Sequence, residues 1–340
     1  MMGFVWRILR FVMVVAAIAG LIVSIKACNS PPEQTTAPQS STAVNAEQSA
    51  SNKPKININT AILSELDKLE AALGVPALSH KIQASRPYGS IDDLVSKKVV
   101  SQAQFDQIKN QLTVEEIVLT GVAKDVDYMT KLGLMKGHML VANELLVLKQ
   151  PEQADPHLGH PVEEIYVDLE EQFQERNVPE FKQMLIDVQT LVRTKPNDPQ
   201  IQPKFDTAMK AIDTAIAALP EDQRSSPNFT MQVINGMLET ATAEYTAAIA
   251  NNKIREVIEY QDSRGFVAYA QDTLFQKIEP QVTQADAKVS ETLNTAFTDL
   301  RKAWPQAIPP ATPVLSPDEV ATKVKNIEMT SQPLLTAAAS

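Results

Sequence analysis

Prolines divide most of this chain into long stretches in which apolar residues recur at helical spacing. Runs that alternate apolar and polar residues, which would predict strands, are nearly absent, and aromatic residues make up only 5% of the chain. Proline interrupts a helix because it lacks an N–H donor and clashes with the preceding turn. The helical stretches that result are 115–150, 162–194, 201–219, 228–250, 254–279 and 283–303. Long helices joined by short connections favour an antiparallel bundle over 115–303, so we expect an all-α fold.

A smaller helical region, residues 55–114, precedes the bundle. Leucines at positions 63, 66, 69 and 73 form one face of a helix, which we predict to be capped by Asn59. Turns follow at Gly74-Val75-Pro76 and at residues 85–89, and Ser101 is expected to cap the last short helix. This region therefore forms a separate small module. After the bundle, residues 304–340 are expected to contain an extended proline-rich segment and a short helix at Pro317–Ile327.

The segments ININTAILSEL, LGVPALSHKI and RPYGSIDDL of the small module agree in spacing with a known pattern. They resemble the helix-hairpin-helix domain of competence proteins of the ComEA type and of the extrinsic helix-hairpin-helix subunit of cyanobacterial photosystem II. The resemblance implies a helix-hairpin-helix fold for residues 55–114. It also implies one of two functions, because the competence proteins bind DNA whereas the photosystem subunit docks on protein.

The two hairpins of the module bear on this choice. DNA-binding versions read Gly-x-Gly, so that bare backbone amides approach a phosphate at a helix N-terminus. Here the first hairpin is Gly74-Val75-Pro76, where proline removes one amide donor, and the second, around Val99-Val100, has no glycine. We therefore favour docking on another envelope protein and keep a DNA receptor as the alternative. The residues that could contact phosphate, or be ordinary surface groups, are Gly74, Lys81, Arg86, Lys97 and Lys98.

The N-terminus has the pattern of an export signal. Arg7 and Arg10 precede an uncharged apolar run, which ends at Ile25-Lys26-Ala27-Cys28. This resembles the lipobox of bacterial lipoproteins, although Lys26 stands where a small or apolar residue is usual. Residues 1–28 are therefore either a lipoprotein signal with lipidation at Cys28 or an uncleaved membrane anchor. Both place the body of the protein in the periplasm, the thylakoid lumen or outside the cell, behind a disordered linker at 29–54.

Three of the four histidines lie close together in the sequence. His138 is expected on a helix, and His157 and His160 in a loop before a helix that begins at Pro161. Histidines and carboxylates that converge between helices are the usual ligands of a metal site in a bundle. The alternative is that the histidines are only hydrogen bonded and that the glutamates complement helix dipoles. The candidate ligands for a transition-metal ion, iron or zinc, are His138, His157, His160, Glu164 and Glu244.

A dense polar run, residues 259–265, interrupts the last part of the bundle pattern. We interpret Glu259, Asp262 and Arg264 as an internal ion-pair network. Together with KLGLMKGHMLVANELL and PHLGHPVEEIY, the segment EYQDSRGF resembles periplasmic helical proteins of the imelysin type, which are linked to iron uptake. Those proteins carry Gly-x-His-x-x-Glu, whereas here Gly137 and His138 are adjacent and Val141 replaces the glutamate. The resemblance implies a helical fold, metal handling and, by analogy alone, peptidase activity.

The bundle lacks the signs of nucleic-acid binding and of catalysis. The net charge of the chain is −10, and the excess of acidic residues lies after residue 114, so the bundle should repel phosphate backbones. The sequence contains no phosphate-binding glycine loop, no HExxH and no nucleophile elbow. We therefore expect a non-catalytic, membrane-anchored envelope binding protein, in which a helix-hairpin-helix docking module precedes a bundle that binds a metal ion.

Overall fold

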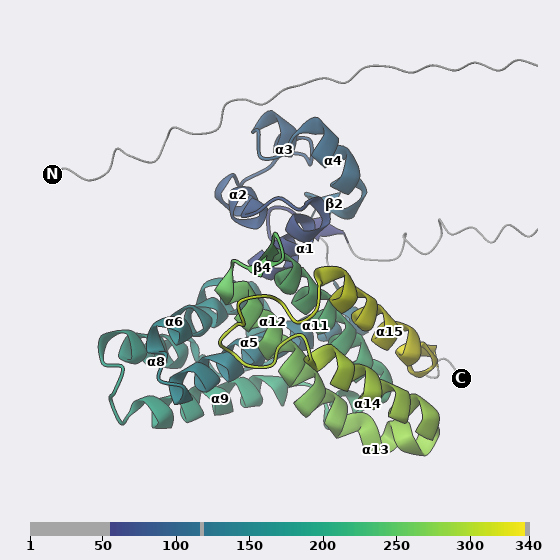
Figure 1. Cartoon of the computed structure of the whole chain (residues 1–340). Helices are drawn as coiled ribbons and strands as arrows, with labels where there is room; N and C mark the ends of the chain where they lie inside the picture. The colour runs from purple at the N-terminus through teal and green to yellow at the C-terminus, as the bar shows by residue number, and fades with distance from the viewer. Residues whose placement is uncertain (1–54, 116–118, 337–340) are drawn as a thin grey trace, which may run out of the picture. The chain divides into compact units, whose positions relative to one another are not determined.

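The computed structural model describes residues 55–115 and 119–336, and this part of the chain is mostly helical (Figure 1). The all-α prediction is confirmed. The strands in these ranges are two residues long: β1 (Ile56–Asn57) pairs in parallel with β2 (Leu112–Thr113), and β3 (Ile249–Ala250) pairs antiparallel with β4 (Lys253–Ile254). Asn251 and Asn252 join β3 to β4 with positive φ angles, which asparagine tolerates better than most residues.

The expected signal or anchor, Cys28 and the linker lie outside the described residues. Within the described ranges, no helix combines the length and the hydropathy that crossing a membrane requires.

Residues 55–115 form the small module around an apolar core of their own. Its elements are α1 (Leu63–Leu73), α2 (Leu78–Ala84), α3 (Asp93–Ser96), α4 (Gln102–Ile108) and a 3₁₀ turn at Lys109–Gln111. The predicted cap at Ser101 is confirmed, because its hydroxyl accepts a hydrogen bond from the Gln104 amide. The predicted cap at Asn59 is wrong. Ile62 is the residue before α1, and the Asn59 side chain instead bonds both backbone groups of Tyr88, which ties the start of the module to the turn before α3.

The larger region is built from helices around a second core, which also includes Ile62 of the small module. α11 packs against α1, α5, α12 and α15, so it lies at the centre of the arrangement. Figure 1 shows α13, α14 and α15 to one side of α11 and α12, and α6, α8 and α9 to the other. The helices are α5 (Gly121–Val147), α6 (Pro151–His160), α7 (Val167–Glu175), α8 (Lys182–Thr194), α9 (Ile201–Ile216), α10 (Glu221–Arg224), α11 (Pro227–Ala247), α12 (Val257–Tyr269), α13 (Gln276–Ala285), α14 (Ala287–Arg301) and α15 (Pro317–Thr336), with π-helical turns at Pro161–Tyr166 and Ala270–Phe275.

Several predicted helices have different boundaries in the structure, and the stretch 254–279 continues through Pro280 to Ala285. The stretch 162–194 is interrupted between α7 and α8, where Asn177 adopts a positive φ of 54°. The C-terminal helix α15 continues past Ile327 to Thr336 and includes Pro333. This extension is stabilised by packing, because Leu334 is buried and α15 lies along α11.

Candidate metal centre

Three helices supply the residues of the candidate site. His138 lies on α5, His157 and His160 lie on the last turn of α6, and Asp262 lies on α12. The prediction of a loop around His157 and His160 is wrong. Pro151 starts α6 at a position where a missing N–H costs little, and the helix continues through Pro156. Because residues three apart share a helix face, both histidines of α6 point the same way.

α5 and α12 approach closely at two glycines. A Cβ atom on Gly265 would overlap the backbone of Gly137, and one on Gly137 would overlap Phe266. Glycine is therefore required on both sides of this contact. The next residue on α5 is His138, and Asp262 lies about one turn before Gly265 on α12, so the glycine contact brings these two side chains together.

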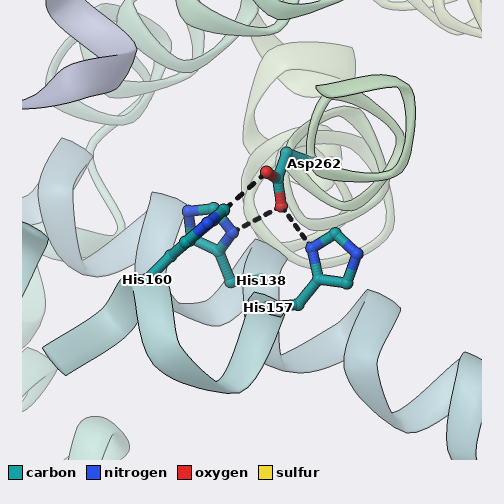
Figure 2. A group of neighbouring side chains, drawn as sticks. All are labelled: His138, His157, His160 and Asp262. Carbon is teal, nitrogen blue, oxygen red and sulfur yellow. Dashed lines mark hydrogen bonds and ion pairs between the residues drawn. The ribbon is translucent and has the colours of Figure 1, made fainter. Parts of the chain in front are cut away.

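The three imidazole rings surround one carboxylate, as Figure 2 shows. The Nδ1 atoms of His138 and His157 lie 2.6 and 2.7 Å from Oδ1 of Asp262, and Nδ1 of His160 lies 3.3 Å from Oδ2. One potential ligand atom from each of the four residues lies within 4.8 Å of all the others. His138, His157 and Asp262 are buried, and His160 is about a quarter exposed, which leaves one edge of the group open to solvent.

The electrostatics of the group differ between its members. Burial lowers the pKa of His138 and outweighs the opposite effect of Asp262, so this imidazole is neutral. Burial would also lower the pKa of His160, but Asp262, Glu164 and Glu259 raise it to about 9. Burial alone would raise the pKa of Asp262, yet the three histidines hold it well below its usual range. The metal-free site therefore contains an ionised carboxylate beside a protonated His160.

One buried atom of the site has no hydrogen-bond partner among the described residues. Nε2 of His138 is buried and unpaired, although a buried polar atom of this kind normally has a partner. A neutral imidazole with a free lone pair is the form that binds metals. Three imidazoles and a carboxylate are a donor set that suits iron, zinc, copper or nickel better than magnesium or calcium. The residues present therefore fit a transition-metal ion.

Further carboxylates lie next to this group. Burial raises the pKa of Asp67 to about 8 and the pKa values of Glu164 and Glu259 to about 7. Burial also raises the pKa of Glu244 well above its usual value, and Asp67 and Asp262 add to this shift by charge repulsion. Asp67 comes from α1 of the small module, whereas the other three come from the bundle. Near neutral pH these carboxyl groups therefore hold protons to a large extent, and burial disfavours the full negative charge they would otherwise carry.

The residues beside Asp262 are held by hydrogen bonds to other segments. Arg264 pairs with both carboxylate oxygens of Glu144 on α5, at 2.8 and 2.9 Å, and donates to the carbonyl of Trp304. The Trp304 indole in turn donates to the Ser263 hydroxyl at 2.8 Å. The predicted ion-pair network of Glu259, Asp262 and Arg264 is therefore wrong in its pairing, because Asp262 meets histidines and Arg264 meets Glu144.

The structure brings His138, His157 and His160 together, as the sequence suggested, and adds Asp262 as a fourth candidate ligand. The sequence pattern predicts Asp262 only as a member of an internal ion-pair network. The signal that could have found it is that Gln261, Asp262 and Ser263 are consecutive polar residues on a helix that must be buried. Glu164 and Glu244, proposed as ligands, lie outside the group of four and belong to the neighbouring carboxylates.

The residues proposed for phosphate contact are spread over the small module, and two of them have partners within it. Arg86 donates to the carbonyls of Ile58 and Ala61 at 2.8 and 2.6 Å. Lys97 donates to two carbonyls, Ser85 at 2.8 Å and Pro87 at 2.6 Å. Gly74 takes a positive φ of 61° at the end of α1, and Lys81 and Lys98 are exposed.

Two families match parts of this chain. Residues 220–338 match an iron permease-associated 4-helix bundle domain, and residues 51–113 match a helix-hairpin-helix motif. No curated protein and no solved structure matches the chain. The helix-hairpin-helix resemblance is confirmed at the level of the motif, and the resemblance to imelysin-type proteins stays a prediction. The bundle match contains Asp262, Glu244 and Glu259, whereas the three histidines precede it.

Proposed function

We propose that this protein binds a transition-metal ion, with iron as the first candidate, through His138, His157, His160 and Asp262. The single observation that carries the proposal is the convergence of three imidazoles on one buried carboxylate, with all four donors within 4.8 Å of one another. Iron is the first candidate because residues 220–338 match a domain whose description associates it with iron permeases. The donor set by itself suits zinc and copper as well.

The surrounding carboxylates support a cation as the ligand. Burial disfavours the negative charge of four neighbouring carboxylates and raises their pKa values. They are Asp67, Glu164, Glu244 and Glu259. A bound cation offsets that penalty, whereas an anionic ligand would add to it. The partly exposed His160 marks the side from which an ion would reach the buried ligands.

In this proposal the protein is a non-catalytic metal handler whose body lies outside the cytoplasm. Residues 1–28 attach it to the membrane, and the helix-hairpin-helix module docks it on another envelope protein. The internal hydrogen bonds of Arg86 and Lys97 support protein docking over the DNA-receptor alternative, because both cations are already engaged within the module.

The test is metal analysis and titration calorimetry of the purified chain with iron(II), zinc(II) and copper(II). We expect one ion to bind per chain at micromolar concentration or tighter, and His157→Ala/His160→Ala to abolish binding. His80→Ala is the matched control, because His80 is the remaining histidine and is exposed on the small module. If none of the three metals binds, or if the double variant binds as well as the unchanged chain, the proposal is wrong.

A further inference from the structure

We propose that Gln261 is a positioning residue for the metal site, which keeps Nδ1 of His157 as the atom available to a metal. The inference rests on the proposed function and extends it to a residue that is not a ligand. Gln261 precedes Asp262 on α12, and both Gln261 and His157 are fully buried, at 0% exposure. Neither side chain can therefore replace its partner with solvent.

The orientation of the Gln261 amide is determined by its neighbours. Its Nε2 lies 2.9 Å from Oε1 of Gln153 and 3.2 Å from the carbonyl oxygen of Ala307. A backbone carbonyl only accepts hydrogen bonds, so the amide NH₂ must face it. The amide oxygen then faces His157, where Oε1 of Gln261 lies 2.8 Å from Nε2 of the ring.

This orientation sets the role of each His157 nitrogen. Because the amide oxygen can only accept, Nε2 of His157 must carry a proton and donate it. Nδ1 is then the nitrogen that faces Asp262, 2.7 Å from Oδ1, and a metal at Nδ1 would displace the proton that this nitrogen shares with the carboxylate. A metal-binding histidine generally donates its other ring N–H to a fixed acceptor, which orients the ring and increases the basicity of the ligand atom. Gln261 is such an acceptor, and Gln153 and Ala307 hold it in place.

The other two histidines lack this arrangement. Among the described residues, Nε2 of His138 has no partner, and His160 makes contacts only through Nδ1 and its ring face. His157 is therefore the ligand whose orientation is fixed before a metal arrives. The conformational entropy of this ring is already lost when the protein folds. Metal binding therefore does not have to order the ring, which increases the affinity.

A purely structural role for Gln261 must be separated from this one, because its bond to Ala307 also holds the segment that follows α14. The test variant is Gln261→Leu, which preserves the approximate volume but removes the acceptor. Gln261→Glu keeps an oxygen toward His157 while losing both amide donations. The matched control is Trp304→Phe, which removes the indole bond to Ser263 between the same two segments and leaves His157 untouched.

The measurements are zinc(II) affinity by competition with a chelator, and nitrogen NMR of the His157 ring with and without zinc. In the unchanged chain we expect a protonated Nε2 in both states and a zinc-bound Nδ1. We expect Gln261→Leu to weaken zinc binding by about 10- to 100-fold and to lose the protonated Nε2 signal. Gln261→Glu should retain that signal and most of the affinity, and Trp304→Phe should leave both unchanged.

These outcomes separate this inference from the proposed function. If the unchanged chain binds no metal, the proposed function fails, but the ring signals of the metal-free protein still report whether Gln261 sets the proton position. If zinc binds and Gln261→Leu retains the affinity and the ring signals of the unchanged chain, the role of Gln261 is refuted and the metal site stands. Equal losses in all three variants would show that Gln261 acts only through packing.

Discussion

Gly265 on α12 packs directly against the backbone of Gly137 on α5, so that only main-chain atoms separate the two helices at this point. His138 and Asp262 lie on either side of this contact, with Nδ1 and Oδ1 2.6 Å apart. The separation of these two polar atoms therefore depends on two residues that have no functional groups.

Replacing Gly265 by alanine tests this dependence. The added methyl group would overlap the Gly137 carbonyl, so the helices must separate, and we expect a loss of about 1–3 kcal/mol in the free energy of unfolding. Metal affinity should fall as well, because the four donors no longer converge. The control is Gly236→Ala, whose methyl group would meet only the Thr130 side chain, at 3.2 Å. Equal metal affinity in the two variants would contradict the argument; chemical denaturation and metal titration measure both effects.

Asp262→Asn removes the charge on which the three histidines converge. Removing one partner from a buried ion pair typically costs about 3–5 kcal/mol, and we expect a loss in this range in urea unfolding of the metal-free chain. Metal binding should be lost. The pKa of His160, raised to about 9 mainly by this carboxylate against the effect of burial, should fall. A His160 pKa in the variant that stays near 9 by NMR titration would refute the assignment of its cause.

Metal affinity is expected to rise with pH. In the metal-free site His160 holds a proton with a pKa of about 9, and a metal must displace that proton. Below pH 9 the affinity should therefore increase roughly tenfold per pH unit and then level off. Glu164→Gln removes one of the charges that raise this pKa, so the plateau should begin at a lower pH. Calorimetry in buffers of different ionisation enthalpy counts the released protons; no proton release at pH 7 would contradict this prediction.

The metal-free protein should lose stability as pH rises from 5 to 8. Burial raises the pKa of Asp67 from 3.8 to about 8, so the folded chain keeps a proton that the unfolded chain releases. The corresponding stability is present in full below pH 3.8 and is lost as pH rises toward 8. The window begins at pH 5 because the depressed pKa of Asp262 gives the opposite dependence in acid.

Asp67→Asn should reduce this pH dependence and raise the melting temperature at pH 8 with a chelator present. The control is Asp106→Asn on the same module, because the carboxylate of Asp106 is about half exposed. Identical stability profiles for Asp67→Asn and the unchanged chain would show that Asp67 does not ionise on unfolding in this window.

Arg86 should matter for the stability of the small module rather than for DNA binding. Its guanidinium bonds the carbonyls of Ile58 and Ala61, two buried residues, and Arg86→Ala leaves those carbonyls without a partner. We expect a cost of about 1–3 kcal/mol in denaturation, against little change for the exposed control Lys81→Ala. Salt-sensitive binding of duplex DNA that Lys97→Ala/Lys98→Ala abolishes without a stability change would instead support the DNA receptor.

Local patterns were sufficient to predict most of the helices. Examples are the apolar periodicity of α9, α11 and α14 and the cap at Ser101. These features depend on residues within one or two turns, so they can be predicted without tertiary information. The sequence pattern does not predict helix α6, because its prolines favour a loop. Packing of its buried residues Ala154 and Leu158 against the core stabilises a helix that local propensity disfavours.

The sequence by itself determined the two helical modules, the position of the helix-hairpin-helix motif and three of the four donors of the candidate site. The sequence did not determine that Asp262 is their partner. The local pattern around a buried acidic residue is the same whether that residue pairs with an arginine on its own helix or with histidines on two other helices. Only the tertiary structure decided this. The glycine contact between α5 and α12 sets the distance between His138 and Asp262. Arg264 pairs with Glu144 instead of Asp262. Contacts between residues more than a hundred positions apart depend on helix packing, which local periodicity does not encode.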